Sequence, residues 1–444
     1  MCETRRPTYE ELEALVLQQA MEIAALRAEI DRLRKGPPFG GEAVVPASPP
    51  AFVKANRPRR EKKERKKRSQ SHVRRRENST AFVVHAVERC PDCDRRLSGG
   101  SVHRTRQVID IPVVPVQIIE HRFMSRYCGV CARSHVAKAD LAGAVVGKRR
   151  IGVRLMSLIA YLAETCRMTK RTIQAYLNTM YGLHLGLGQI CELLHAVAHK
   201  GQAFYDALLQ QVRGSPVVHA DETGWREDGV NGYVWSFSTP DTRIYVRNQS
   251  RGHAVPQSVL GDAYKGVIVS DFYGGYNYHL GEHQRCWVHL LRDLQELVEK
   301  NPDNASVKRW TGKVVKLYKK AHDFHSDKPR ERARARFRFQ NRLEALGKLH
   351  ADTDQPQHTL AQRCVQRANE LFTFVEFPEV PSENNAAERA VRPLVIARKI
   401  SGGTRSEHGS DTKMVLASLF GTWAIRGQDP RQQCLTILAG QTSV

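Results

Sequence analysis

The chain has 444 residues, of which 69 are Lys or Arg and 46 are Asp or Glu, so its formal net charge is +23. At roughly 100 to 200 residues per domain this length predicts several domains, and 41% hydrophobic residues suffice to build their cores. No uninterrupted apolar run reaches the ~18 to 20 residues that span a bilayer, and no apolar signal core follows Met1. We therefore expect a cytoplasmic protein, and the charge favours a polyanionic partner such as nucleic acid.

Residues 1–35 are expected to form a helix with a heptad repeat of apolar side chains. One apolar position of the heptad holds Tyr9, Val16, Ile23 and Ile30, and the other holds Leu12, Gln19, Leu26 and Leu33. This pattern is typical of a short coiled coil that pairs two copies of the chain. An amphipathic helix packed on its own domain gives the same pattern, so both interpretations stay open.

Residues 36–80 combine a stretch rich in Pro, Gly and Ala with a basic run, and we expect a flexible linker. Within it, residues 54–76 contain 13 Lys and Arg against two Glu, which supplies +11 of the net charge. Such a run is either a solvated tail or a nonspecific phosphate contact. We favour the phosphate contact, because the remaining +12 is spread over other segments of the chain.

Two Cys-x-x-Cys pairs lie in residues 81–140, one at Cys90 and Cys93 and the other at Cys128 and Cys131. Between them, Val108 to Ile119 is rich in the β-branched residues that favour strands. Four thiolates from two such turns suit tetrahedral Zn²⁺ in a closed structural site. The sequence therefore predicts a zinc-ribbon domain, although redox pairs or coincidental cysteines remain alternatives.

Residues 141–213 are expected to be helical. Leu155, Leu158, Ile159 and Leu162 share one helical face, Thr169 precedes a second helix with a basic start, and a third begins near Gly188. Short helices of this kind resemble a helix-turn-helix region, so we predict a helical DNA-binding domain. Small helical connectors have the same appearance and are the alternative.

Residues 214–300 follow the order strand, strand, strand, helix, strand. The expected elements are strands at Val217–Ala220, Tyr233–Ser238, Arg243–Arg247 and Val267–Ser270, a helix near His253–Leu260, and a further helix over Arg285–Lys300. This is the order of an RNase H-like fold, in which the first and fourth strands lie side by side. Asp221 and Asp271 directly follow those two strands and should lie together. The predicted fold class is a multidomain α/β protein with an RNase H-like core.

Residues 301–378 are expected to form a helical insertion into this core. Arg334, Arg338 and Arg342 lie four residues apart and therefore share one helical face. Such a face is either a solvated surface or a phosphate-binding surface. We take Arg334 and Arg338 as candidate DNA contacts.

Residues 379–444 are expected to complete the core, with Glu388 on a helix as its third carboxylate. Asn384 and Arg392 lie four residues to either side of Glu388 and share its face, where Asn384 would bond a phosphate or a ligand water and Arg392 would clamp DNA. A Glu followed by Arg at the fourth position is also an ordinary ion pair worth ~0.3 to 0.5 kcal/mol. Glu383 is the alternative carboxylate, and Glu222 is expected to be structural.

The three carboxylates Asp221, Asp271 and Glu388 are residue types that bind Mg²⁺, a hard cation that prefers oxygen ligands. Two such ions about 3.5 to 4 Å apart stabilise both the attacking and the leaving oxygen of a phosphoryl displacement. Their pattern predicts a two-metal site for phosphodiester chemistry.

These features together resemble the insertion-sequence-66 (IS66) family of transposases over nearly the whole length of the chain. The motifs that carry the resemblance are Asp221-Glu222-Thr223, Ser270-Asp271 with Gly275-Tyr276, Cys286-Trp287-Val288-His289, Asn384-Asn385-x-x-Glu388-Arg389-x-x-Arg392-Pro393 with Arg398-Lys399, and a tail from Ser418 to Pro430. The resemblance implies a DDE transposase that hydrolyses phosphodiesters at its element ends and transfers the strand to target DNA. Asp221, Asp271 and Glu388 would be its metal-binding triad.

In this interpretation, phosphates would be positioned by Asn384, Asn385, Arg389, Arg392, Arg398 and Lys399. The expected partners are element-end and target DNA, a second copy of the chain or a larger assembly on DNA, and accessory transposition proteins, all at the nucleoid and away from membranes. Two other functions remain open. One is a catalytically inactive DNA-binding regulator derived from a transposase, and the other is an RNase H-like nuclease or resolvase.

Overall fold

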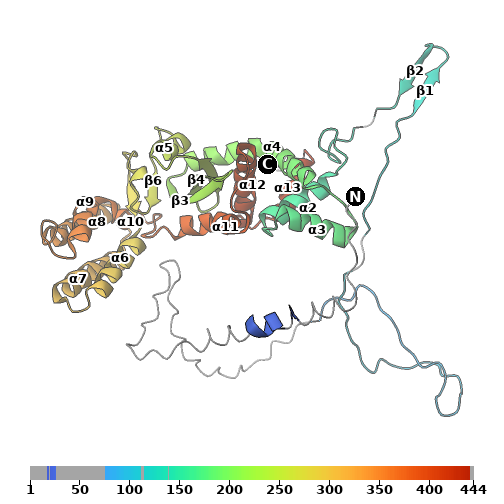
Figure 1. The fold of residues 1–444 in the computed structure, drawn as a ribbon, viewed down its shortest axis with the longest axis horizontal. Coiled ribbons are helices and arrows are strands. Elements are labelled where there is room, and N and C mark those ends of the chain that lie inside the picture. Colours follow the sequence, from blue (N-terminus) through green and yellow to red (C-terminus); the bar gives the residue numbers. More distant parts are fainter. Residues whose placement is uncertain (1–17, 20, 27–75, 112–114, 139, 441–444) are drawn as a thin grey trace. The chain divides into compact units, whose positions relative to one another are not determined.

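The computed structural model describes residues 18–19, 21–26, 76–111, 115–138 and 140–440 (Figure 1). They belong to two compact units, residues 1–110 and residues 111–444. Residues 18–19 and 21–26 of the predicted coiled coil are helical, whereas the rest of that segment and residues 54–75 of the basic run lie outside the described residues. In the described residues no helix is long and apolar enough to cross a membrane.

The segment between the two cysteine pairs differs from the prediction. Residues 108–111 and 115–119 were expected as strands but are not in regular structure. Strand propensity reflects packing against neighbouring strands, so a run of β-branched residues does not form a strand when no partner strand pairs with it. The strands lie further along, where β1 (Ser125–Cys128) and β2 (Arg133–Val136) form an antiparallel hairpin with Cys128 opposite Arg133.

A five-stranded sheet lies at the centre of residues 111–444. Its strands are β3 (Val217–Glu227), β4 (Val230–Ser238), β5 (Arg243–Asn248), β6 (Val267–Ser270) and β7 (His283–Arg285), in the spatial order β5, β4, β3, β6, β7. The first three strands pair antiparallel, and β6 and β7 continue the sheet in parallel. The predicted neighbourhood of the first and fourth strands is confirmed, because Val217 to His219 pair with Val267 to Val269.

The strand β7 was not predicted, since it is only three residues long and consists of His, Gln and Arg. The helix expected from Arg285 begins instead at Trp287, as α6 (Trp287–Lys300). Helix α5 (Ala254–Leu260) connects β5 to β6, as expected. Arg285 therefore belongs to the sheet, and its side chain is 1% exposed.

Helices from both ends of this unit share one hydrophobic core with the sheet. They are α2 (Val153–Glu164), α3 (Lys170–Tyr181), α4 (Leu187–Arg213), α12 (Glu407–Ile425) and α13 (Pro430–Leu438). Helix α4 is long, with 27 residues, and it packs closely on α12, since a Cβ at Gly201 would lie 2.5 Å from a methyl of Leu419. The expected domain boundary between residues 213 and 214 therefore falls inside a continuous core.

Helix α12 also covers the edge strand β5. The hydroxyl of Ser418 accepts from the backbone N–H of Tyr245 at 2.9 Å, and the hydroxyl of Thr422 accepts from that of Arg243 at 3.0 Å. Side chains of α12 thus satisfy backbone donors that an exposed edge strand would present to solvent or another chain.

Residues 301–378, predicted as a helical insertion, are mostly helical and contribute to a hydrophobic core separate from that of the sheet. They contain α7 (Ala305–His322), α8 (Pro329–Lys348), α9 (His358–Gln366) and the short α10 (Thr373–Glu376), which pack with α6 around Trp287 and Phe372. Phe272, the residue after Asp271, packs against this cluster. The chain then returns to the sheet through α11 (Asn385–Ser401), which carries Glu388.

Candidate active site

The two aspartates extend from neighbouring strands at the point where those strands diverge. Asp221 lies two residues beyond His219, the last residue of β3 that pairs with β6, and Asp271 directly follows β6. Strand β3 was expected to end before Asp221. It continues instead to Glu227 along β4, with Asp221 opposite Ser236. Asp221 therefore has a fixed backbone, whereas Asp271 begins a loop.

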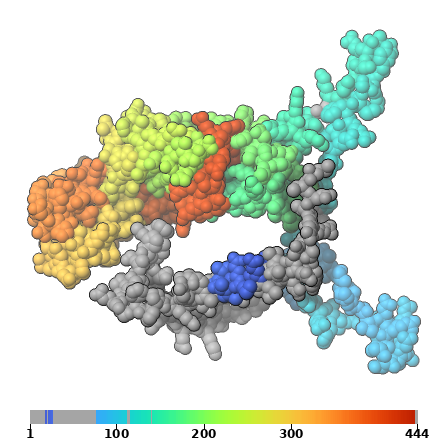
Figure 2. All heavy atoms as spheres, viewed as in Figure 1, coloured from blue at the N-terminus to red at the C-terminus, as the bar shows by residue number. Residues whose placement is uncertain are grey.

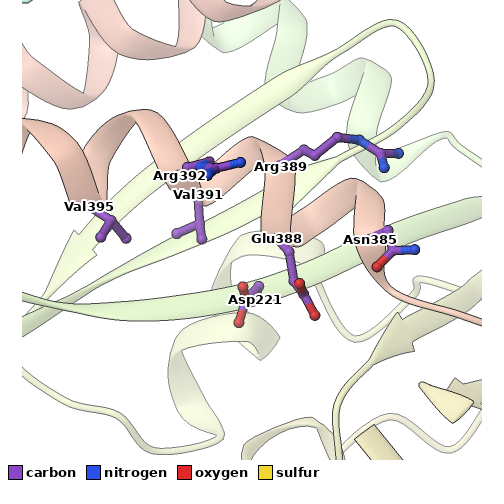
Figure 3. Close-up of a pocket in the computed structure, with 7 residues that line it drawn as sticks. All are labelled: Asp221, Asn385, Glu388, Arg389, Val391, Arg392 and Val395. Carbon is purple, nitrogen blue, oxygen red and sulfur yellow. The ribbon is translucent and has the colours of Figure 1, made fainter. Parts of the chain in front are cut away.

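Glu388 lies above Asp221 on the first turn of α11 (Figure 3). Asp221 and Glu388 line a cavity of about 450 Å³ together with Asn385, Arg389, Val391, Arg392 and Val395. Although the Glu388 side chain is 42% exposed, its Oε1 atom is buried and has no hydrogen-bond partner among the described residues. A buried carboxylate oxygen without a partner is costly unless a cation or a donor occupies the space beside it.

Burial is the main cause that raises the pKa of Asp221, to about 7. The charges of Glu222, Asp271 and Glu388 add to this effect, while a hydrogen bond from the backbone N–H of Glu222 opposes it. The four carboxylates are therefore close enough to repel one another. In the described residues, no group of three or more His, Cys, Asp or Glu side chains is already gathered as a metal site.

His289 is a member of the site that the sequence motif contained but to which no role was assigned. Its Nε2 atom lies 3.9 Å from Oε1 of Glu388. The neighbouring Cys286 raises the pKa of His289, and the carboxylates of Asp271 and Glu388 contribute in the same direction, while burial opposes them. The imidazole thus lies where a positive charge is favoured.

Arg285 holds the loop that carries Asp271, a role that sequence reasoning missed. Its Nη1 donates to the Asp271 carbonyl at 2.9 Å and to the Ser270 hydroxyl at 3.0 Å, and its Nη2 donates to Asn277 at 2.6 Å. Its Nε donates to Glu370 of the insertion at 2.5 Å. One buried guanidinium therefore ties β6, the Asp271 loop and the insertion together.

Asn384 has a different role from the one expected. Its side chain is 2% exposed, and its amide nitrogen donates to the Ala220 carbonyl at 2.8 Å while its amide oxygen accepts from Nδ1 of His219 at 3.1 Å. Its backbone N–H donates to the Cys286 sulfur at 3.2 Å. Because the amide is buried and bonded at both ends, it is not free to bond a phosphate. Asn384 instead fixes the start of α11 against β3.

Arg398 is likewise engaged in the structure rather than free. It donates to the Thr223 hydroxyl at 3.2 Å and to the Gly224 carbonyl, so it fastens the last turns of α11 to β3. Arg389, Arg392 and Lys399 are exposed on α11, and Asn385 lines the cavity. These four residues remain available to a ligand, in contrast to Asn384 and Arg398.

Glu222 is buried beside Asp221, on the opposite side of β3. It accepts a hydrogen bond from the Tyr276 hydroxyl at 2.6 Å and pairs with Arg251 at 2.7 Å. Both oxygens of the carboxylate are satisfied, so Glu222 acts in the structure as an anchor for Tyr276 and Arg251.

The cysteine pairs each form a turn that favours the thiolate. Backbone N–H groups of Asp92 and Cys93 lower the pKa of Cys90, and those of Cys131 and Val130 lower the pKa of Cys128. Thiolates are the form that binds zinc. Each pair is thus suited to supply two ligands, and the two pairs belong to different units of the chain.

A sequence model of the Transposase IS66 family matches residues 148–412, more than half of the chain. The matched residues include the sheet, the insertion and all three carboxylates of the site. The chain therefore belongs to the IS66 transposase family.

Three relatives from Sinorhizobium fredii are uncharacterized proteins. The chain is 33% identical to y4jO over 218 residues, which are 49% of this chain and 65% of y4jO. It is 22% identical to y4jD over 290 residues, 58% of this chain and 56% of the relative. It is 20% identical to y4hP over 400 residues, 80% of this chain and 71% of the relative. The matches thus span less than two thirds of y4jO and y4jD.

Proposed function

We propose that this chain is a DDE transposase, which hydrolyses phosphodiesters at its element ends and joins the resulting 3′-hydroxyl to target DNA. Membership of the IS66 family supports a transposase role. The observation that carries the finer proposal is the shared cavity of Asp221 and Glu388, with Asp271 near enough to raise the pKa of Asp221. The sheet order β5, β4, β3, β6, β7 supports an RNase H-like core.

Asp221, Asp271 and Glu388 would hold two Mg²⁺ ions. The Oε1 atom of Glu388, which lacks a hydrogen-bond partner among the described residues, and the repulsion that Asp221 experiences from the other carboxylates fit a cation at this place. When bound, the ions would activate the attacking oxygen and stabilise the leaving oxygen. Arg285 would keep Asp271 in position, and Arg389 and Arg392 would hold the phosphates on either side of the scissile bond.

The remaining segments would serve recognition and assembly. Zn²⁺ held by Cys90, Cys93, Cys128 and Cys131 would order residues 81–140, and together with helices α2 to α4 this segment would recognise the element ends. The helix within residues 1–35 would pair two copies as a coiled coil so that two ends meet. Accessory proteins and association with the nucleoid belong to the same proposal.

The test is a Mg²⁺-dependent cleavage assay on DNA that carries the element's own ends. Glu388→Gln is expected to lose cleavage at least a hundredfold while it still binds the ends. Glu383→Gln is the matched control, because Glu383 lies five residues before Glu388, just outside α11, and should keep most of the activity. Loss of cleavage in Glu383→Gln alone would move the third carboxylate to Glu383.

End binding without cleavage in the wild-type chain would favour the inactive regulator. Cleavage without joining to target DNA would favour the nuclease. The presence of all three carboxylates in the chain supports the active enzyme over the regulator.

A further inference from the structure

The helical insertion carries a basic surface that lies apart from the carboxylates. Helix α8 has arginines at alternate positions from 330 to 338, and helix geometry divides them into two rows. In the first row, Arg332 donates to the Glu376 carbonyl at 2.9 Å, and Arg336 pairs with Glu282 at 2.6 Å and with Glu376 at 2.9 Å. This row holds α8 to the rest of the insertion and to the sheet.

The second row consists of Arg334, Arg338 and Arg342, and all three are exposed. In the described part of the chain, none of them has a hydrogen bond or an ion pair. Glu331, the acidic residue nearest to Arg334 along the helix, is already paired with Lys328 at 3.0 Å. Arg334 contributes to the lowered pKa of Glu331 but forms no ion pair with it. Three exposed charges on one face that form no ion pair in the described residues favour an external anion.

Phe337 lies beside this second row, three residues after Arg334, and is 63% exposed. The contrast with Phe339 is informative, because Phe339 is packed inside and stacks on Phe372 with ring centres 5.7 Å apart. Phe337 thus presents an aromatic ring to solvent one helical turn from the exposed guanidinium of Arg334. In Figure 2 the atoms of the insertion are drawn in yellow and orange, at the left of the view.

The neighbouring helix α7 adds to the positive charge, which sequence reasoning overlooked. It has no acidic residue, and its exposed cations are Lys308, Arg309, Lys313, Lys316, Lys319 and Lys320. The two helices are joined where the indole of Trp310 donates to the Leu346 carbonyl at 2.9 Å. Helices α7 and α8 together therefore carry many exposed positive charges, which favour binding of a polyphosphate such as a DNA strand.

We propose that the α8 face binds a DNA strand with an unpaired base, with Phe337 stacked on that base and Arg334, Arg338 and Arg342 on its phosphates. A paired base is covered by its neighbours in the duplex, whereas an unpaired base offers a free face to an aromatic ring. The proposal rests on the proposed function, since the strand would belong to an opened element end. Phe272 packs on the insertion core, so this face and Asp271 belong to one packed structure.

The experiment compares two fluorescent probes on the full chain without added Mg²⁺, a blunt duplex and the same duplex with a short single-stranded thymidine tail. The wild-type chain is expected to prefer the tailed probe by about fivefold or more. Phe337→Ala should lose this preference and bind the blunt duplex as before, and Phe337→Trp should keep it. Leu349→Ala, which removes another exposed apolar side chain at the end of α8, is the matched control and should change neither affinity.

The double change Arg334→Gln, Arg338→Gln should weaken binding of both probes and flatten the dependence of log K on log salt by about 1.4 to 1.8. The proposal is overturned if the wild-type chain shows no preference for the tail, or if Phe337→Ala keeps it. It is also overturned if Phe337→Ala changes only the oligomeric state in light scattering. The binding test uses no metal, so its result does not depend on whether the chain cleaves DNA. If the chain cleaves element ends but shows no preference for the tailed probe, the α8 proposal is refuted and the proposed function is not.

Discussion

The guanidinium of Arg285 donates a hydrogen bond to the backbone carbonyl of Asp271 at 2.9 Å, while the same side chain pairs with Glu370 of the insertion at 2.5 Å. The position of a site carboxylate is therefore coupled to the packing of a helical domain inserted far along the chain. This coupling explains why an arginine, with donors fixed in a planar fork, stands at a position that is 1% exposed.

Arg285→Gln is expected to lower the free energy of unfolding by roughly 3 to 5 kcal/mol, because it leaves Glu370 buried without its main partner. Arg285→Lys should fold better but cleave at least tenfold more slowly, since an ammonium cannot reproduce the fork. Arg367→Gln is the control, because Arg367 also contacts Glu370, at 2.8 Å, but not the Asp271 loop. Urea unfolding and the end-cleavage assay measure the two effects, and equal cleavage in Arg285→Lys and wild type would contradict the positioning role.

Asn384→Ala is expected to lower the free energy of unfolding by about 1 to 3 kcal/mol, since it leaves buried groups of His219 and Ala220 without partners. Cleavage should fall with it, because the start of α11 is released from β3. Asn385→Ala, at the half-exposed neighbouring position, should leave stability nearly unchanged. If Asn384→Ala instead weakened only DNA binding, the direct phosphate contact expected from the sequence would be restored.

Asp221→Asn should stabilise the metal-free protein at high pH. The pKa of Asp221 is raised from 3.8 to about 7, so the folded state retains a proton that the unfolded state releases. The resulting penalty is absent below about pH 4, grows as the pH rises, and is complete above about pH 7. Each pKa unit corresponds to about 1.4 kcal/mol, and after a discount for solvent screening we expect roughly 2 kcal/mol at pH 8.

Thermal unfolding of the wild-type chain and Asp221→Asn between pH 5 and pH 8 measures this difference. Mg²⁺ should raise the Tm of the wild-type chain and have a smaller effect on the variant. A Tm difference that is constant across this pH range would show that the carboxyl of Asp221 does not titrate there.

Arg392→Gln should mainly weaken DNA binding, whereas Arg398→Gln should mainly lower the stability of the fold. Arg392 is exposed beside the cavity, so its loss should weaken DNA binding and reduce the salt dependence by about 0.7 to 0.9 without an effect on stability. Arg398 is bonded to Thr223 and Gly224, so its loss should lower the Tm with a smaller change in salt dependence. A salt titration and a melting curve on both variants suffice, and the reverse pattern would contradict this assignment.

The sequence predicted the parts of the site that follow from local pattern. Asp221 follows the buried apolar run at the start of β3, Asp271 follows β6, and the parallel pairing of these two runs brings the aspartates near each other. The face of Arg334, Arg338 and Arg342 also followed from helical spacing. The structure separates it from Arg332, which is hydrogen-bonded to the Glu376 carbonyl, and from the ion-paired Arg336.

The roles of Asn384, Arg398 and Arg285 could not be predicted in the same way. Each depends on a partner more than ten residues away, such as Ala220, Gly224 or the Asp271 carbonyl, and spacing along one helix does not show which polar side chain is buried. Polar residues near a site carboxylate therefore include both residues that can contact a ligand and residues that hold the site in place. Only the tertiary contacts show which residue belongs to which group.

The central claim is that Asp271 is a metal ligand of the active site. Its most direct test replaces this ligand and compares cleavage with two different metal ions. Asp271→Cys replaces a carboxylate by a thiolate, which binds Mg²⁺ poorly but accepts softer ions such as Mn²⁺. We predict that the variant binds element ends, does not cleave them in Mg²⁺, and regains measurable cleavage in Mn²⁺. Full activity of Asp271→Cys in Mg²⁺, or none in either metal with end binding intact, would contradict a role for Asp271 as a metal ligand.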